Sequence, residues 1–340
     1  MKLATYKDGS RDGQLVVVSR DLTSAHYATG IANKLQQVLD DWNFLSPQLQ
    51  DLYDTLNRAG AHTAGVSKGR HAFPFDPQQC MAPLPRAYQR VDGSAYMNHV
   101  ELLRTSVYRE LSKHSAGEPL LCQRGSDDLL GACDDVVVGS ESLGIDFVAQ
   151  LAVITGEVRL NTTPAQALDS IRLLMLANDI ELRHRVSTEM TGADGSLLSH
   201  KATSFSPVAV TLDELGDAWD KGRLHLRLQS SWNGRMVGMC DAGAQMNFHF
   251  GQLIAQLCQN RKVRAGTIIC SGAVSNNDRD QGYSCIAEKR AVETRDDGHP
   301  ATEFMKYGDI VRIEMKGLDG LSLFGAIEQQ IVPIENVRAD

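Results

Sequence analysis

The chain has 340 residues, of which 42% are hydrophobic and 22% are charged, a composition typical of a globular protein with a sizeable core and about two domains. Its formal net charge of −8 argues against a general binder of nucleic acids or anionic membranes. The sequence contains no apolar run long enough to span a bilayer and no N-terminal signal pattern, so a cytoplasmic protein is expected.

The seven cysteines are widely spaced and include no C-x-x-C pair. An odd number in this arrangement is unlike a disulfide framework or a zinc finger, and it predicts mostly free, buried thiols. The glycine-rich, G-x-S-x-G and H-E-x-x-H motifs of nucleotide-binding proteins, α/β-hydrolases and zinc proteases are also missing from the sequence. Nucleotide, flavin and zinc sites are therefore not expected.

A small N-terminal domain is expected over residues 1–77 and a main domain over residues 78–335. Glycines and prolines interrupt the segment 60–85, which is typical of a connection between domains. Turn residues between two β-compatible segments predict a hairpin near the N-terminus, and apolar residues at helical spacing predict two helices after it. The hairpin strands are expected over 3–6 and 14–19, and the helices over 31–42 and 45–56.

The main domain is expected to be β-rich, with a few helices. Residues 145–156 form an apolar, β-compatible run that stops at Gly156, so they predict a buried strand with Val148 and Gln150 on one face. Asn233-Gly234 is a strong hairpin signal between two later strands. The remaining expected elements are strands at 134–138, 267–270, 310–315 and 323–331, a helix over 248–258, and a polar, lid-like loop over 105–130.

A further helix is expected to begin at Thr162-Thr163-Pro164, with a Thr as its cap and Pro164 in its first turn. The apolar run 165–176 is expected to continue it as a helix or as a helix–strand element. This element is predicted to end near Asp179.

Several ordered blocks of the main domain together resemble the fumarylacetoacetate hydrolase family. They are the segments 145–156, 176–183, 201–207, 266–272 and 282–290, followed by Gly308-Asp309. The resemblance covers residues 78–332 and is weaker over residues 1–75. It implies an α+β, β-rich fold with a rolled, mixed β-sheet in the main domain and a small N-terminal domain, assembled as a homodimer.

The resemblance also identifies the positions of a metal site. In the family, an Asp-x-Glu-x-Glu strand supplies two Glu ligands for Mg²⁺ or Ca²⁺, and a later Asp supplies a third. Here Val148 and Gln150 replace the two Glu residues, and Asp179 matches the later Asp. Val148 has no lone pair and Gln150 offers one neutral oxygen, so we expect either no metal or a weakly bound Mg²⁺ or Ca²⁺ held by Asp179 with Gln150. Local hydrogen bonding at a helix end is the alternative role for Asp179.

Arg183 and Lys201 match basic residues that contact the oxo and carboxylate groups of substrates in the family. Fixed cations stabilise the enolate charge that develops when a 1,3-dicarbonyl or 2-oxo acid is cleaved or isomerised. The resemblance therefore implies that Arg183, Lys201 and Asp179 are catalytic. Solvated surface cations are the alternative for the two basic residues.

Hydrolases of the family use a His with a Glu partner for proton transfer. Thr105 stands where this His is expected, which leaves His99 as the candidate catalytic base and a structural histidine as its alternative. His114 and Glu110, at i,i+4 spacing, form a second candidate pair, with an exposed helix pair as the alternative.

Four residues are expected to bind substrate. Arg124 lies in a block that resembles a substrate loop, at a position where relatives carry a small residue, and it suits a carboxylate. Ser271 belongs to a turn that is Ser-Gly-Thr in the family, whose Thr is Ala273 here. Gln150 faces the same site, and Glu288 matches a block close to it, as an orienter of another side chain or as a structural acid.

Three functions are compatible with this pattern. The first is a diverged enzyme with weak or no metal dependence, acting on a 2-oxo or 1,3-dicarbonyl acid by C–C cleavage, isomerisation, dehydration, decarboxylation or cyclisation. The second is an ordinary Mg²⁺-dependent C–C bond hydrolase, and the third is a non-catalytic homologue that binds an organic acid or a protein partner. The neutral face at 148–150 disfavours the second function. The presence of Asp179, Arg183 and Lys201 favours the first over the third, since function resides in sites.

Overall fold

Two long antiparallel strands, β9 (Ile145–Thr155) and β10 (Ile171–Leu182), form the centre of the fold. The computed structural model describes residues 1–60, 71–106, 117–127, 129–185 and 199–334. Every residue of β9 is buried, because its side chains alternate between two packed layers. Across the pair, Val148 lies opposite Asp179 and Gln150 lies opposite Ala177. The predicted buried strand is therefore confirmed, and its register places the resembling metal positions side by side.

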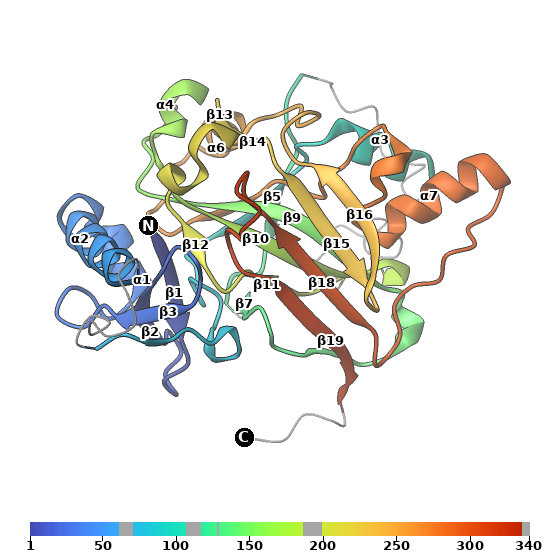
Figure 1. The fold of residues 1–340 in the computed structure, drawn as a ribbon. Coiled ribbons are helices and arrows are strands. Elements are labelled where there is room, and N and C mark those ends of the chain that lie inside the picture. The colour runs from blue at the N-terminus through green and yellow to red at the C-terminus, as the bar shows by residue number, and fades with distance from the viewer. Residues whose placement is uncertain (61–70, 107–116, 128, 186–198, 335–340) are drawn as a thin grey trace.

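The main sheet extends from this pair on both sides (Figure 1). Its order is β4-β3-β2-β1-β12-β10-β9-β17-β5-β6, and β11 pairs with both β10 and the short β7. The predicted N-terminal hairpin is confirmed as β1 and β2, and it is continuous with the main sheet through β12. The other strands of this sheet are β1 (Lys2–Tyr6), β2 (Gln14–Val18), β3 (Ser24–Tyr27), β4 (Phe73–Pro74), β5 (Arg90–Gly93), β6 (Leu121–Arg124), β7 (Leu129–Leu130), β11 (His200–Phe205), β12 (Ala209–Val210) and β17 (Ile268–Cys270).

A second sheet crosses one face of β9 and β10, in the order β16-β15-β18-β19-β8 (Figure 1). Asn233 and Gly234 connect β15 and β16 with φ angles of 49° and 76°, as the Asn-Gly hairpin signal predicts. The strands are β8 (Val136–Val138), β15 (Arg227–Trp232), β16 (Arg235–Asp241), β18 (Ile310–Met315) and β19 (Ile327–Pro333). A separate two-stranded ribbon is formed by β13 (Trp219–Asp220) and β14 (Arg223–Leu224).

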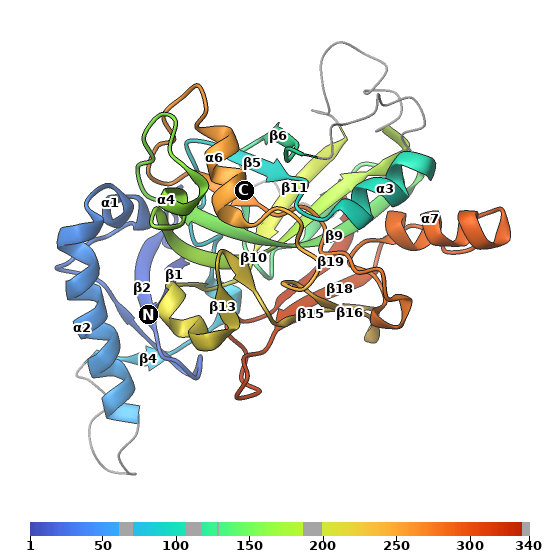
Figure 2. The same ribbon diagram turned by 90° about the horizontal axis from the view of Figure 1, so that it is seen from above.

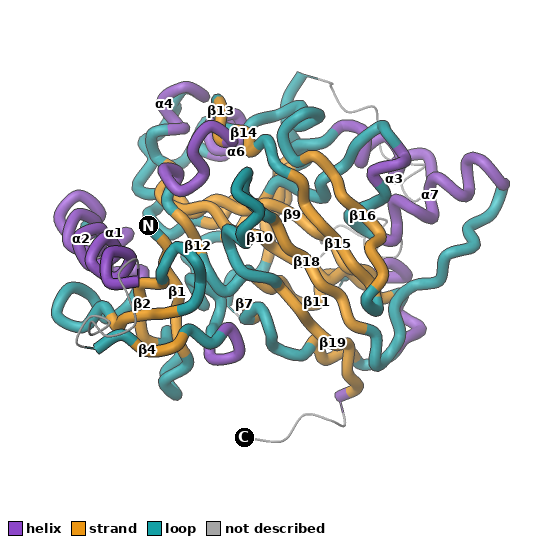
Figure 3. The backbone as a smooth tube through the Cα atoms, viewed as in Figure 1, coloured by secondary structure: helices purple, strands orange, loops and turns teal. Residues whose placement is uncertain are grey.

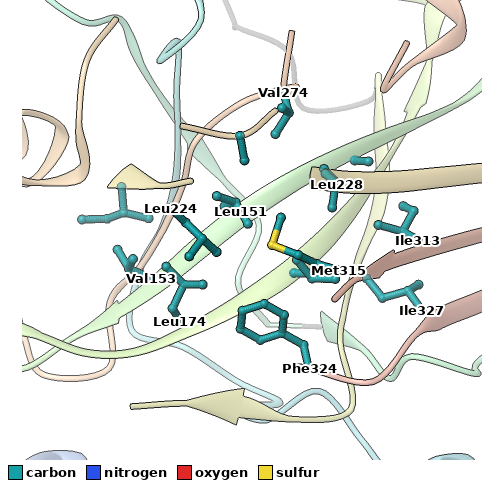
Figure 4. Close-up of a cluster of buried hydrophobic side chains, with 14 of the residues drawn as sticks. Leu151, Val153, Leu174, Leu224, Leu228, Val274, Ile313, Met315, Phe324 and Ile327 are labelled. Carbon is teal, nitrogen blue, oxygen red and sulfur yellow. The ribbon is translucent and has the colours of Figure 1, made fainter. Parts of the chain in front are cut away.

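The space between the two sheets is filled by apolar side chains, which form the largest part of the core (Figure 4). Leu151 and Val153 of β9 and Leu174 of β10 lie in one cluster with Leu224 and Phe324 and with Leu228 and Met315 of the second sheet. Burial of this face is the main hydrophobic contribution to the fold. The opposite face of β9 and β10 is consequently the one available for a polar site.

The helices lie at three places around the sheets (Figures 2 and 3). Two cover the N-terminal strands, two lie near one end of the main sheet, and α3 and α7 pack against one another at the other side. They are α1 (Leu35–Asp40), α2 (Trp42–Gly60), α3 (Met97–Ser106), α4 (Pro164–Leu168), α6 (Phe250–Leu257) and α7 (Ile286–Asp297).

Two expectations about secondary structure need correction. A helix begins at the predicted Thr-Thr-Pro segment, with Thr163 as its cap, but α4 ends at Leu168 and Ile171 already begins β10, so Asp179 lies inside a strand and not at a helix end. The run is apolar on both faces because both faces of β10 are buried, and such a run does not distinguish a strand from a helix. Within the loop predicted over 105–130, β6 and β7 are strands, while 107–116 and 128 lie outside the described residues.

All seven cysteines are free thiols, and five of them are buried, as predicted. Within the described residues, no helix is long and apolar enough to cross a membrane. The boundary expected between residues 77 and 78 stays a prediction.

Helix α7 is anchored to β9 by one buried carboxylate. Asp146, which is 0% exposed, accepts hydrogen bonds from the backbone N–H groups of Ile286 (2.7 Å) and Ala287 (3.0 Å) at the first turn of α7. A negative charge at a helix N-terminus is stabilised by the N–H groups and the helix dipole. The same carboxylate accepts from Nε of Arg183 at 2.8 Å. Burial nevertheless raises the pKa of Asp146 above its ordinary value.

We predict that Asp146→Asn lowers the free energy of unfolding by about 3–5 kcal/mol, because it removes one of the two carboxylates that pair with the buried Arg183 and the charge that accepts from the first turn of α7. Urea denaturation followed by circular dichroism measures this change. Asp51→Asn, at an exposed position of α2, is the control and is expected to stay within about 0.5 kcal/mol of the wild type. Equal stability of both variants would show that Asp146 does not anchor the helix.

Candidate active site

Seven charged side chains form a continuous series of ion pairs on the face of the main sheet that the second sheet leaves uncovered. The order is Asp146–Arg183–Glu181–Arg124–Asp92–Arg90–Asp179. These residues come from β9, β10, β5 and β6 and from the position after β10, and each is 13% exposed or less. Buried charges persist only when they are paired and hydrogen-bonded, so this series fixes the geometry of the face.

Arg90 lies at the end of the series, between two carboxylates. Its Nη2 atom is 3.0 Å from Asp92 Oδ1 and 2.9 Å from Asp179 Oδ1. The Thr203 hydroxyl donates a short hydrogen bond to the same oxygen of Asp179. Since β5 and β10 are separated in the sheet by β17 and β9, these contacts require the sheet to curl until its strands face one another. The rolled sheet expected from the resemblance is thus what brings Arg90 to Asp179.

The residues at the expected metal positions are engaged in other contacts. Val148 is 3% exposed and packs in an apolar cluster with Leu102, Ala273 and Cys285. The amide oxygen of Gln150 accepts from the Gly272 N–H at 3.1 Å. With Asp179 paired to a guanidinium, the three positions do not offer the set of charged oxygen ligands that a hard divalent cation requires.

The Ser271-Gly272-Ala273 turn is held against β9. Gly272 has φ +78°, and a Cβ atom there would lie 2.4 Å from the carbonyl oxygen of Gly93. Only glycine satisfies both conditions without strain. Ser271 is buried, its hydroxyl donates to the Gly272 carbonyl at 2.7 Å, and it accepts from the Leu151 N–H at 3.2 Å. Substrate contact by Ser271 and Gln150 stays a prediction, because the contacts described serve the turn.

His99 and Glu288 form a second polar pair, between α3 and α7. Nδ1 of His99 is 3.4 Å from Oε2 of Glu288, and the other oxygen, Oε1, accepts from Ser275 at 2.6 Å and from Asn98 at 3.5 Å. Glu288 is therefore held by three side chains and can orient the imidazole of His99. It also lines a cavity of about 520 Å³ together with Asn98.

Ligand atoms of His99, Glu288 and Cys285 lie within 4.8 Å of one another, an arrangement that matches part of a transition-metal site. Burial raises the pKa of the Cys285 thiol well above its ordinary value, however, and a thiol must be deprotonated to bind a metal. The backbone of Cys285 pairs with Val148 in a β-bridge, which places the His99–Glu288 pair beside the first of the two substituted metal positions.

The remaining predicted residues are placed as follows. Nε of Arg124 is 2.9 Å from Asp92, and the guanidinium of Arg183 pairs with Asp146 and Glu181, so both cations belong to the buried series. The backbone of Lys201 lies in β11, at an irregularity in the pairing with β10. His114 and Glu110 lie outside the described residues, and the catalytic roles of all these residues stay predictions.

Arg90, Asp92 and Asp146 were missed by reasoning from the sequence. Asp146 is the first Asp of the Asp-x-Glu-x-Glu pattern, which was a usable signal. Asp92 carried no signal that the sequence analysis used, and the structure places it between Arg90 and Arg124. No sequence signal indicated Arg90, because its contact with Asp179 depends on the curl of the sheet.

Comparison with known proteins gives two matches to family profiles. Residues 1–86 match the profile described as "Fumarylacetoacetase N-terminal domain 2", and residues 90–332 match "Fumarylacetoacetate (FAA) hydrolase C-terminal". An uncharacterized protein from Archaeoglobus fulgidus is 24% identical over 181 residues, which cover 53% of this chain and 65% of that protein. The match thus spans less than two thirds of the relative's length.

Two solved structures show the same fold at low sequence identity. The maleylpyruvate hydrolase of Sphingobium sp. SYK-6, in complex with manganese(II) and pyruvate, has a TM-score of 0.64 at 15% identity and covers 98% of this chain and 99% of its own. The 2-hydroxyhepta-2,4-diene-1,7-dioate isomerase of Mycobacterium marinum has a TM-score of 0.59 at 14% identity, with coverage of 98% and 99%.

We predict that Gly272→Ala lowers the free energy of unfolding by more than the ~1–2 kcal/mol cost of a left-handed residue, because its Cβ also meets the Gly93 carbonyl. Gly320→Ala is a matched control, since Gly320 has φ +81° and no atom within 4 Å of the added Cβ. Chemical denaturation of both variants gives the comparison. If the two changes cost the same, the turn is not tightly packed against β5.

Proposed function

Since the chain belongs to the fumarylacetoacetate hydrolase family, we propose that it is an enzyme acting on a small 2-oxo or 1,3-dicarbonyl acid with weak or no dependence on a divalent metal. The observation that carries this proposal is the environment of Asp179, which is paired with Arg90 beside an apolar Val148 and an amide at Gln150. The neighbours of known fold include a hydrolase named for maleylpyruvate and an isomerase named for 2-hydroxyhepta-2,4-diene-1,7-dioate. The reaction type, the cytoplasmic location and the homodimer stay predictions.

His99 is the residue we assign to proton transfer. The carboxylate of Glu288 holds the Nδ1 side of the imidazole, which leaves Nε2 to accept a proton from the substrate or to return it. Ser275 and Asn98 donate to Glu288 in turn, so the pair has the base-and-orienter arrangement that general acid–base catalysis uses.

The guanidinium and ammonium groups of Arg124, Arg183 and Lys201 are assigned to the negative charge of the substrate. Cleavage or isomerisation next to a carbonyl group develops an enolate, and preorganised cations in a water-poor site stabilise that charge. Of the two guanidinium groups, that of Arg124 is the more exposed, at 11% against 5% for Arg183. It is therefore the group that we expect to bind the substrate carboxylate.

We predict that activity on acylpyruvates or 2-oxo acids is the same with EDTA, without additions and with added Mg²⁺. The physical reason is that charged side chains, and not a metal, provide the positive charge of the site. Initial rates of the purified protein, with metal content determined in parallel, measure this. Activity that EDTA abolishes and Mg²⁺ restores would favour the ordinary hydrolase, whereas binding of these acids in thermal-shift assays without any turnover would favour a non-catalytic homologue.

We further predict that His99→Gln lowers kcat by about 10²–10⁴-fold with a small change in KM, as expected for loss of a general acid–base group. His299→Gln, at an exposed position, removes an imidazole without effect on rate and serves as the control. Steady-state kinetics on an active substrate give the comparison. Equal kcat values for the His99 variant and the wild type would exclude His99 from proton transfer.

A further inference from the structure

We propose that the guanidinium of Arg90 occupies the place of the divalent cation and excludes a metal ion from this site. Two carboxylate oxygens, Asp92 Oδ1 and Asp179 Oδ1, lie within 3.0 Å of a single nitrogen atom, Nη2 of Arg90. A metal ion at this place would also be a cation shared by the two carboxylates. The inference deepens the proposed function and rests on it for its chemical meaning, but its test needs no substrate.

The burial of Arg90 supports a permanent role for this charge. The side chain is 3% exposed, and its Nε atom is buried without a hydrogen-bond partner. Folding of an arginine into such a position is costly unless strong pairing offsets the loss of hydration. The two carboxylates provide that pairing, which explains why the guanidinium is held at this point and not at the surface.

The charges next to Arg90 give a second argument. The resembling pattern has two Glu residues at positions where this chain has Val148 and Gln150, so two negative charges are lost. A divalent ion would then face only Asp92 and Asp179 among the described carboxylates next to Arg90. Arg90, together with Arg124 on the other side of Asp92, supplies two positive charges in its place. The arginines therefore replace the charge of the ion while the loss of both Glu residues removes its ligands.

The shape of the neighbouring surface agrees with this assignment. Val148 and Ala273 belong to the same apolar cluster, and the Gln150 amide is bound to the Gly272 backbone. Val148 and Ala273 thus offer no ligand atom to an ion, and the amide oxygen of Gln150 already accepts a hydrogen bond. Removal of Arg90 should consequently leave the Asp92–Asp179 pair, with Arg124 still beside Asp92, as the site for a cation.

The test is a titration of Mn²⁺ into the full-length protein, followed by the EPR signal of free Mn²⁺ and by thermal unfolding. The wild type is expected to show neither saturable binding nor a concentration-dependent rise in Tm. Arg90→Ala, and Arg90→Gln as a variant that keeps hydrogen-bond donors, are expected to gain one saturable site and a Tm that rises with Mn²⁺, because two neighbouring buried carboxylates lose their shared cation.

Three controls make the result specific. Arg90→Lys keeps a cation between the carboxylates and is expected not to gain the site. Asp179→Asn in the Arg90→Ala background is expected to lose it again. Arg86→Ala removes a surface arginine that pairs with Asp12, and it is expected to leave Mn²⁺ binding at the wild-type level, which excludes a general effect of net charge.

Two results would overturn the proposal. One is a saturable Mn²⁺ site in the wild type that Asp179→Asn abolishes, because the metal would then bind although Arg90 is present. This measurement does not need the Arg90 variants to fold. The other is a folded Arg90→Ala or Arg90→Gln protein that gains no Mn²⁺ binding. Neither depends on turnover, so an inactive protein with the expected binding pattern would reject the proposed function and leave this inference intact.

Discussion

A buried guanidinium between two carboxylates determines the character of this site. Arg90 reaches Asp92 and Asp179 across the interior of a curled sheet, and the series of ion pairs continues from there to Asp146 and the start of α7. Breaking one member of a buried pair leaves an uncompensated charge that costs about 3–5 kcal/mol. The electrostatics of the site and the position of α7 are therefore parts of one network.

In our proposal, this network keeps the scaffold of the family while the residues at the expected metal positions change. The β9–β10 pair, the Ser271-Gly272 turn and the His99–Glu288 pair depend on backbone register and on contacts that need no ion. At the first position, Val148 places an apolar side chain next to Ala273. At the second, Gln150 makes a hydrogen bond to the backbone where the resembling pattern has a charged ligand. Each change is compatible with a folded site in which arginine side chains, and not a bound ion, carry the positive charge.

Much of the fold could be predicted from the sequence, because periodicity and turn chemistry are local. The strand around Val148 and Gln150, the hairpin at Asn233-Gly234 and the cap at Thr163 are examples. The run 165–176 was ambiguous, since burial on both faces removes the periodicity that separates strands from helices. Helix α7 went unpredicted for a related reason: its polar, charged sequence has a weak apolar stripe, and its start is fixed by the remote Asp146.

The site was predictable only where residues matched a pattern. Asp179 and Glu288 were identified because they lie in sequence blocks that resemble the family. Arg90, which pairs with Asp179, lies 89 residues away in the sequence, on a strand that two other strands separate from β10. A contact of this kind depends on tertiary curvature, and no local signal reports it. The same holds for the contact of His99 with Glu288, which joins two helices 189 residues apart.

The most direct measurement is a crystal structure of the protein grown with Mn²⁺ and pyruvate, with anomalous differences recorded for manganese. The account predicts Nη2 of Arg90 between Asp92 and Asp179, and no anomalous peak within bonding distance of Asp179. An anomalous peak bound by Asp179 and Gln150, with the Arg90 side chain displaced, would contradict it.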